Sequence, residues 1–189
     1  MKKWILMTLL IFTTISSLTA QPKAPLEKIF FYGIDYSQVK VCLATESEND
    51  FREAFLKINS LLLEESDKYD LGRALKAEVT IDIATVWEKM ESAPLSEMKI
   101  TSTRYDSPDY AAIVKAYELP DKEGTGIVFI AELLNKPAEE GTYTVVKFDI
   151  ASRKILESRT ITAAAGGFGL RNYWANTVYK TIKAIKKGF

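Results

Sequence analysis

The chain of 189 residues contains 25 basic and 25 acidic residues and no histidine. Without His it cannot form a Ser-His-Asp triad, a Cys-His catalytic pair or a His-ligated zinc site. Its single cysteine, Cys42, excludes an intrachain disulfide and a cysteine-rich metal cluster. The neutral charge balance argues against a dedicated nucleic-acid binder, which is usually strongly basic. An enzyme built from this chain would have to use carboxylate, Lys, Tyr or Ser–Lys chemistry.

The N-terminal segment 1–20 has the pattern of a secretory signal peptide. Two lysines form a positive start, residues 4–12 are almost wholly apolar, and small residues precede Ala20. The apolar run is too short to cross a bilayer by itself. We therefore expect cleavage near Ala20, a periplasmic or secreted protein, and one domain over residues 21–189 with no transmembrane segment.

The first part of the mature chain has the periodicity of two strands, a helix and a third strand. Residues 29–34 and 39–44 are rich in β-formers, and we expect Cys42 to be buried in the second of these strands. Strict alternation over 78–83 predicts a half-exposed strand, which a helix over 50–65 would reach by a crossover. The helix is predicted from apolar residues at steps of four, three and four: Phe51, Phe55, Ile58 and Leu62.

Asp35 and Ser37 lie in the turn between the first two strands. They could form a polar site, but residues of this kind more often make local side-chain-to-backbone hydrogen bonds. We favour the local hydrogen bonds.

The middle of the chain has weaker signals. Residues 71–77 could form a short helical turn, residues 85–91 are ambiguous, and residues 92–102 have the composition of a loop that Pro94 interrupts. The sequence Ser107-Pro108-Asp109 is a strong helix start, because Ser is a good N-cap and Pro suits the first helical position. The helix is expected to end near Tyr117.

The last part of the chain has the clearest structural signals. Residues 125–135 form an apolar run between turn signals, which is typical of a central strand covered on both faces. Residues 143–150 and 154–164 predict a hairpin. A long amphipathic helix follows, with Trp174, Val178, Ile182 and Ile185 on its apolar face.

These elements predict a single α+β domain with the order β-β-α-β-α-β-β-β-α. The sheet is expected to be mixed and to have five or six strands, with the helices packed mainly on one face.

The glycine loop Gly166-Gly167-Phe168-Gly169 precedes the last helix, where backbone N–H groups can bind a phosphate. However, the loop lacks the Gly-Lys-Ser/Thr ending of a phosphate loop and the Gly-x-Gly-x-x-Gly spacing of a dinucleotide site. We therefore interpret it as a strand-to-helix turn that needs positive φ angles.

The chain ends in a basic segment without acids. After Glu157 every charged residue is basic, whereas the rest of the mature chain contains more acidic than basic residues and has a net negative charge. This end could dock to an anionic surface, although lysines near a helix C-terminus also complement the helix dipole. The candidate binding surface consists of Gly167, Arg171, Asn172, Tyr173, Lys180 and Lys183. No residue pattern predicts a catalytic residue, a metal site or a cofactor.

Two stretches carry a resemblance. The segments FYGIDYSQVK (31–40) and GLRNYW (169–174) look like small secreted proteins of unknown function from Gram-negative envelopes. The order of the elements is also similar to the α/β domain shared by the curli-secretion lipoprotein and the outer-membrane activators of penicillin-binding proteins. The resemblance implies an envelope location and no particular activity.

Three functions follow as hypotheses. The first is a non-enzymatic binding or accessory module of the cell envelope, with an envelope protein or a glycan as its partner. The second is a carboxylate-based glycan hydrolase, which needs two carboxyl groups about 5–10 Å apart in a cleft. The third is a peripheral membrane-surface protein that uses its basic C-terminal helix.

Overall fold

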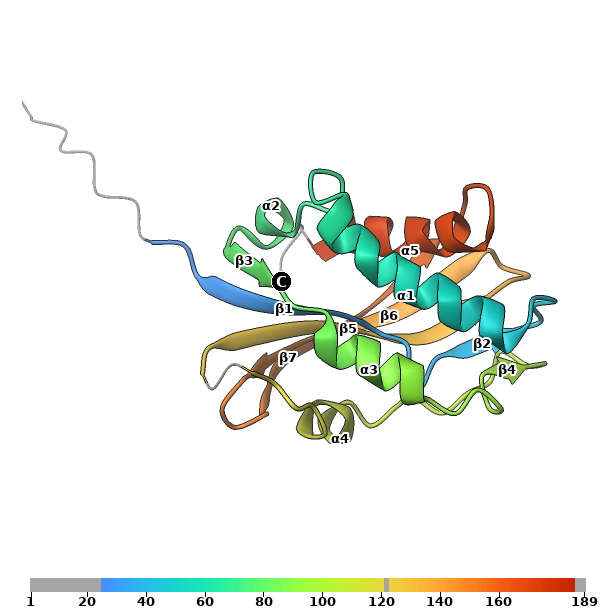
Figure 1. Cartoon of the computed structure of the whole chain (residues 1–189), viewed down its shortest axis with the longest axis horizontal. Coiled ribbons are helices and arrows are strands. Elements are labelled where there is room, and N and C mark those ends of the chain that lie inside the picture. Colours follow the sequence, from blue (N-terminus) through green and yellow to red (C-terminus); the bar gives the residue numbers. More distant parts are fainter. Residues whose placement is uncertain (1–24, 121–122, 186–189) are drawn as a thin grey trace, which may run out of the picture.

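A seven-stranded mixed sheet forms the centre of the computed structural model, which describes residues 25–120 and 123–185 (Figure 1). The predicted signal peptide over 1–20 lies outside the described residues. The strands are β1 (Lys28–Asp35), β2 (Lys40–Cys42), β3 (Glu78–Ile81), β4 (Lys99–Ile100), β5 (Thr125–Asn135), β6 (Glu140–Asp149) and β7 (Ile155–Ala164). The helices are α1 (Glu48–Glu64), α2 (Leu71–Leu75), α3 (Ala84–Ser92), α4 (Tyr110–Lys115) and α5 (Leu170–Ile185).

Strand β5 is the longest and the most central. On one side, β1 pairs with its first half and β2 pairs with its last residues, both in parallel. The sheet continues from β1 to β3 and from β2 to β4, again in parallel. On the other side, β6 and then β7 add antiparallel strands. Strands β1 and β2 therefore lie end to end along the same side of β5, and residues 36–39 interrupt the strand between them.

The clear periodicities are confirmed. All four residues of the predicted stripe on α1 are buried, and α1 begins with a capping box between Ser47 and Asp50. The interior of β5 is buried along its whole length, as expected for a central strand. The hairpin of β6 and β7 is present, the apolar face of α5 is buried, and Cys42 is fully buried in β2.

The predicted element order is wrong, because the structure adds α2, α3 and β4. Strand β4 has two residues, so it is too short to show any alternation. Helix α3 has no side-chain cap at Ile83, which removes the usual sign of a helix start. Helix α4 begins later than predicted, since Asp109 and not Ser107 is its N-cap. The sheet consequently has seven strands, where five or six were expected.

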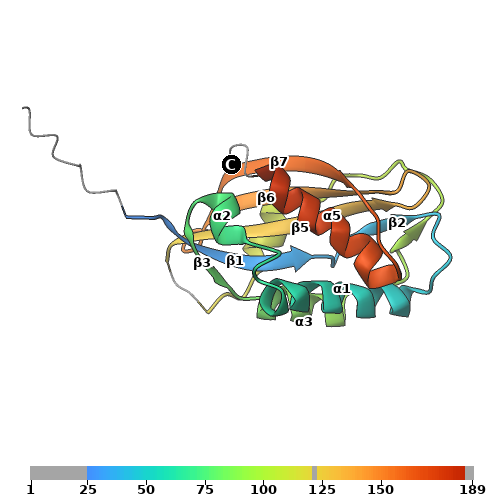
Figure 2. The same cartoon turned by 90° about the horizontal axis from the view of Figure 1, so that it is seen from above.

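The helices cover both faces of the sheet. The larger apolar cluster packs α1, α2 and α5 against one face, and Figure 2 shows α5 lying across the strands. The smaller cluster packs α4 on the opposite face. Helix α3 contributes Val86 to the smaller cluster and Met90 to the larger one. We expected the helices to pack mainly on one face of the sheet, and this holds for α1, α2 and α5 but not for α4.

Candidate functional site

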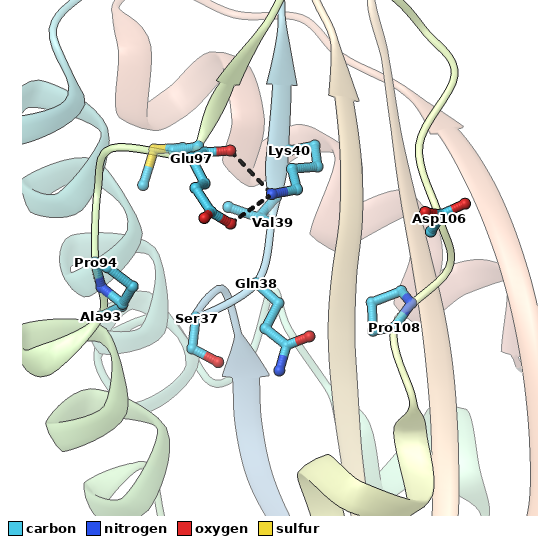
Figure 3. A pocket seen from close by; sticks show the side chains of 10 residues that line it. Ser37, Gln38, Val39, Lys40, Ala93, Pro94, Glu97, Asp106 and Pro108 are labelled. Carbon is cyan, nitrogen blue, oxygen red and sulfur yellow. Dashed lines mark hydrogen bonds and ion pairs between the residues drawn. The ribbon is translucent and has the colours of Figure 1, made fainter.

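A cleft of about 340 Å³ lies at the break between β1 and β2 (Figure 3). Three segments of the chain form it: the break itself, and, much later in the sequence, the turn after α3 and the segment before α4. The residues that line it are Ser37, Gln38, Val39, Lys40, Ala93, Pro94, Glu97, Met98, Asp106 and Pro108.

Helix α1 holds the end of β1 that leads into this break. The buried side chain of Asn59 accepts a hydrogen bond from Ile34 N at 2.8 Å and donates one to Ile34 O at 2.9 Å. The register of β1 against β5 shifts at this point, and Gly33 has a φ of 83°. A Cβ atom on Gly33 would lie 2.7 Å from Asn59 Oδ1, so this position requires glycine.

Asp35 ends β1 and is only 1% exposed. Its Oδ1 accepts a hydrogen bond from Ser37 N at 2.8 Å, which confirms the predicted local bond. Its Oδ2 accepts a second bond from the Tyr117 hydroxyl at 2.8 Å. The carboxylate therefore ties the break in the strand to the residues after α4.

Lys40 is the only base among the residues that line the cleft. Its Nζ donates to Glu97 O at 3.0 Å and lies 3.8 Å from Glu97 Oε2. Figure 3 shows this contact on one side of the cleft and Asp106 on the other. With two acids and one base, the lining carries a net negative charge.

Sequence reasoning missed Glu132, which lies within the apolar run of β5. It is 2% exposed, and its Oε2 accepts a hydrogen bond from the Tyr105 hydroxyl at 2.9 Å. Its Oε1 accepts bonds from the Tyr110 hydroxyl at 2.8 Å and from Thr144 Oγ1. Thr144 in turn bonds Thr160 at 2.7 Å. The sequence signal that could have found this cluster is a single acidic residue inside an apolar run.

The strand register places the two buried carboxylates near each other on one face of the sheet. Asp35 lies beside Ile130, and Glu132 is two residues further along β5. Within the described part of the chain, neither carboxylate forms an ion pair. Glu132 binds hydroxyl groups instead, Asp35 binds one hydroxyl and one backbone N–H, and neither lines the cleft.

The tyrosine hydroxyls remain protonated donors in this arrangement. Burial raises the pKa of Tyr117 well above its ordinary value, and the Asp35 carboxylate raises it further. Burial likewise raises the pKa of Tyr105, and the hydrogen bond to Glu132 adds to the effect. Both hydroxyls therefore keep their protons across the neutral range.

We expect the protein to lose stability in alkaline solution. Burial raises the pKa of Tyr143 to about 12 and also raises the pKa values of Tyr36 and Tyr117. An unfolded tyrosine loses its proton near pH 10, so above that pH the unfolded state binds fewer protons than the folded state. The stabilisation is complete below pH 10 and declines as the pH rises towards the folded-state values, by about 2–3 kcal/mol for Tyr143 alone.

Urea unfolding at increasing pH, together with the absorbance of tyrosinate, measures this decline. Replacing Tyr143 by Phe should make the decline shallower. A free energy of unfolding that stays constant from pH 9 to pH 12 would contradict the expectation.

The structure does not bring the six predicted surface residues into one site. Gly167 and Asn172 line a shallow groove of about 210 Å³, whereas Arg171 lines a different one of about 260 Å³. Lys183 borders a third groove of about 310 Å³, and its Nζ lies 4.4 Å from the centre of the Tyr179 ring. The prediction of positive φ in the glycine loop is confirmed at Gly167 and Gly169, whose φ angles are 111° and 79°.

The other two predicted residues make contacts within the protein. The ring of Tyr173 lies 3.8 Å from Lys136 Nζ, and Lys180 Nζ donates to Ala164 O at 3.0 Å. Sequence reasoning gave no role to Phe168, which is 94% exposed at the tip of the glycine loop.

Over residues 25–120 and 123–185, no cluster of three or more acidic or cysteine side chains could hold a metal ion. None of the helices in that part of the chain combines the length and the apolar character needed to span a membrane.

Comparison with known proteins gives no relative. No family model, no curated protein and no solved structure matches the chain. The resemblance to envelope proteins therefore stays a prediction.

Proposed function

We propose that the mature protein is a non-enzymatic binding module of the cell envelope, periplasmic or secreted, that holds a small polar ligand in the cleft beside Lys40. The observation that carries the proposal is the convergence of Lys40, Glu97 and Asp106 on one cleft from three segments of the chain. The envelope location rests on the signal-peptide pattern of residues 1–20.

The size and lining of the cleft support a small ligand. Its volume of about 340 Å³ lies at the lower end of the range for small-molecule sites. Gln38 is exposed and offers an amide that can both donate and accept hydrogen bonds. A single sugar unit of an envelope glycan, or a short peptide, has the matching size and polarity.

A binding role also agrees with the state of the carboxylates. Asp35 and Glu132 are buried, and each uses both of its oxygens to accept hydrogen bonds. Glu97 is exposed and lies beside the ammonium of Lys40. These contacts favour structural and ligand-binding roles over attack on a substrate.

Replacing Gln38 by Trp should block the cleft without disturbing the core, because this side chain is exposed on the break between the strands. We expect a ligand of the wild-type protein to bind the variant at least tenfold more weakly. Monosaccharides and dipeptides should be screened by thermal shift, and each hit measured by isothermal titration calorimetry. A ligand at 100 times its dissociation constant stabilises the protein by about 2.7 kcal/mol, which a thermal shift detects.

Glu64→Trp is the matched control, since Glu64 is exposed on α1 and does not line the cleft. This variant should bind as tightly as the wild type. If Gln38→Trp binds every hit with unchanged affinity, the cleft is not the binding site and the proposal is wrong.

One observation favours glycan hydrolysis as a second candidate. Glu97 and Asp106 line the cleft from opposite sides, as two catalytic carboxyl groups would (Figure 3). If this is the function, the purified protein should release reducing sugar from an envelope polysaccharide. Glu97→Gln and Asp106→Asn should each abolish that release, whereas release that survives both changes would exclude this pair.

A further inference from the structure

The segment 101–109, which connects β4 to α4, is attached to the body of the protein mainly through side chains. Most of its residues are exposed, and only Tyr105 and Pro108 are partly buried. In the described chain, no backbone hydrogen bond joins residues 101–108 to a strand or helix of the sheet domain. A segment with so few backbone contacts opens at a low free-energy cost.

Tyr105 ties this segment to the sheet, and Ser107 bonds Tyr110 on α4. The Tyr105 hydroxyl donates to Glu132 at 2.9 Å. The next residue, Asp106, lines the cleft together with Pro108. The segment is therefore one wall of the cleft, and the side chain that fixes this wall is adjacent to the lining residues.

Glu132 itself lies beside the floor of the cleft. Lys40, which lines the cleft, pairs in register with Leu133, the residue after Glu132. Neighbouring strands are about 4.8 Å apart, so the backbone of Glu132 runs next to the strand that carries Lys40. Tyr105, which bonds the Glu132 carboxylate, is followed in the chain by the lining residue Asp106.

Within residues 25–120 and 123–185, Glu132 forms no ion pair. Buried carboxylates are usually paired with a cation, because burial without one is costly. Among the described residues Glu132 has only hydroxyl partners, and the one base that lines the cleft, Lys40, donates to Glu97 O. The cleft lining adds two further acids. This charge distribution favours a ligand that carries an ammonium group.

We propose that segment 101–109 is a lid latched by Tyr105, and that a ligand ammonium group replaces the Tyr105 hydroxyl on Glu132 when the lid opens. The inference rests on the proposed binding function of the cleft and specifies the class of its ligand. The lid can be tested without any ligand, so the two proposals can fail separately.

The latch is tested by tryptic cleavage of the Arg104–Tyr105 bond, which lies within the lid. In Tyr105→Phe the ring remains but the hydroxyl is lost, and we expect cleavage after Arg104 to be about tenfold faster, the effect of losing one hydrogen bond to a charged group. Thr144→Val is the matched control. It removes a hydroxyl from the same carboxylate, but this hydroxyl comes from β6 and not from the lid. Cleavage rates that are equal in the wild type and Tyr105→Phe would overturn the latch.

The ligand class is tested by calorimetry with glucosamine, using glucose as the probe of similar shape without an ammonium group. We expect glucosamine to bind more tightly than glucose and to accelerate cleavage after Arg104. Tyr105→Phe should bind glucosamine several-fold more tightly, because the competing hydroxyl is gone. Glu132→Gln should lose the preference for glucosamine, once circular dichroism shows that the variant is folded.

Equal affinity for the two sugars, or no glucosamine binding by a protein whose cleft binds another ligand, would overturn the ammonium proposal. Such a result would leave the proposed function intact, because that function fails only if Gln38→Trp binds like the wild type. If Glu132→Gln does not fold, the affinity of Tyr105→Phe decides the question: an affinity no higher than that of the wild type would contradict the replacement of its hydroxyl.

Discussion

Replacing Trp174 by Ala should lower the free energy of unfolding by about 3–5 kcal/mol. Trp174 is fully buried on α5, in the cluster between the helix and the sheet, and its ring packs edge-on against Tyr173 at 4.9 Å. Truncation removes this contact and leaves a cavity that the surrounding strands can fill only in part. Urea unfolding followed by circular dichroism gives the difference.

Phe168→Ala is the matched control for this change. Phe168 is an aromatic residue six positions earlier, but it is 94% exposed. Its removal should change the free energy of unfolding by no more than about 0.5 kcal/mol. A loss for Trp174→Ala as small as that of the control would show that α5 does not close the core as described.

Replacing Asn59 by Leu should cost about 2–5 kcal/mol. The variant leaves the N–H and C=O groups of Ile34 buried without partners, and each such group costs about 1–3 kcal/mol. Because Asn59 also packs against the bulge at Gly33, the last residues of β1, which lead into the cleft, should shift in the variant. Urea unfolding measures the stability, and binding of a cleft ligand reports the effect on the site.

Asn49→Leu provides the comparison, because Asn49 is exposed in the first turn of the same helix. This change should alter the stability by no more than about 0.5 kcal/mol. If both leucine variants unfold at the same urea concentration, the two hydrogen bonds to Ile34 do not stabilise the protein.

The long elements were predictable because their burial repeats along the chain. Helix α1 has four apolar residues at helical spacing, and β5 is an unbroken apolar run, so each pattern specifies both the type of element and its buried face. Short elements carry no such repeat. Strand β4 exists because its two residues pair with β2, and helix α3 is stabilised by packing against β1 and α1.

The candidate site was not predictable for a related reason. Lys40, Glu97 and Asp106 are ordinary surface residues in the sequence, and only the break between β1 and β2 brings them to one cleft. The cluster around Glu132 depends on β5, β6 and α4 meeting at one point, and no spacing in the chain encodes that meeting.

From the sequence alone, the absence of histidine excludes whole classes of catalytic and metal chemistry, and the periodicity determines the central strand, the hairpin and the two long helices. These conclusions hold because they depend on composition and on contacts between residues close in the chain. The tertiary structure alone decided the strand order, the break in the sheet and the pairing of Tyr105 with Glu132. Those features arise from contacts between distant segments, whose partners are chosen by packing and by the need to satisfy buried polar groups.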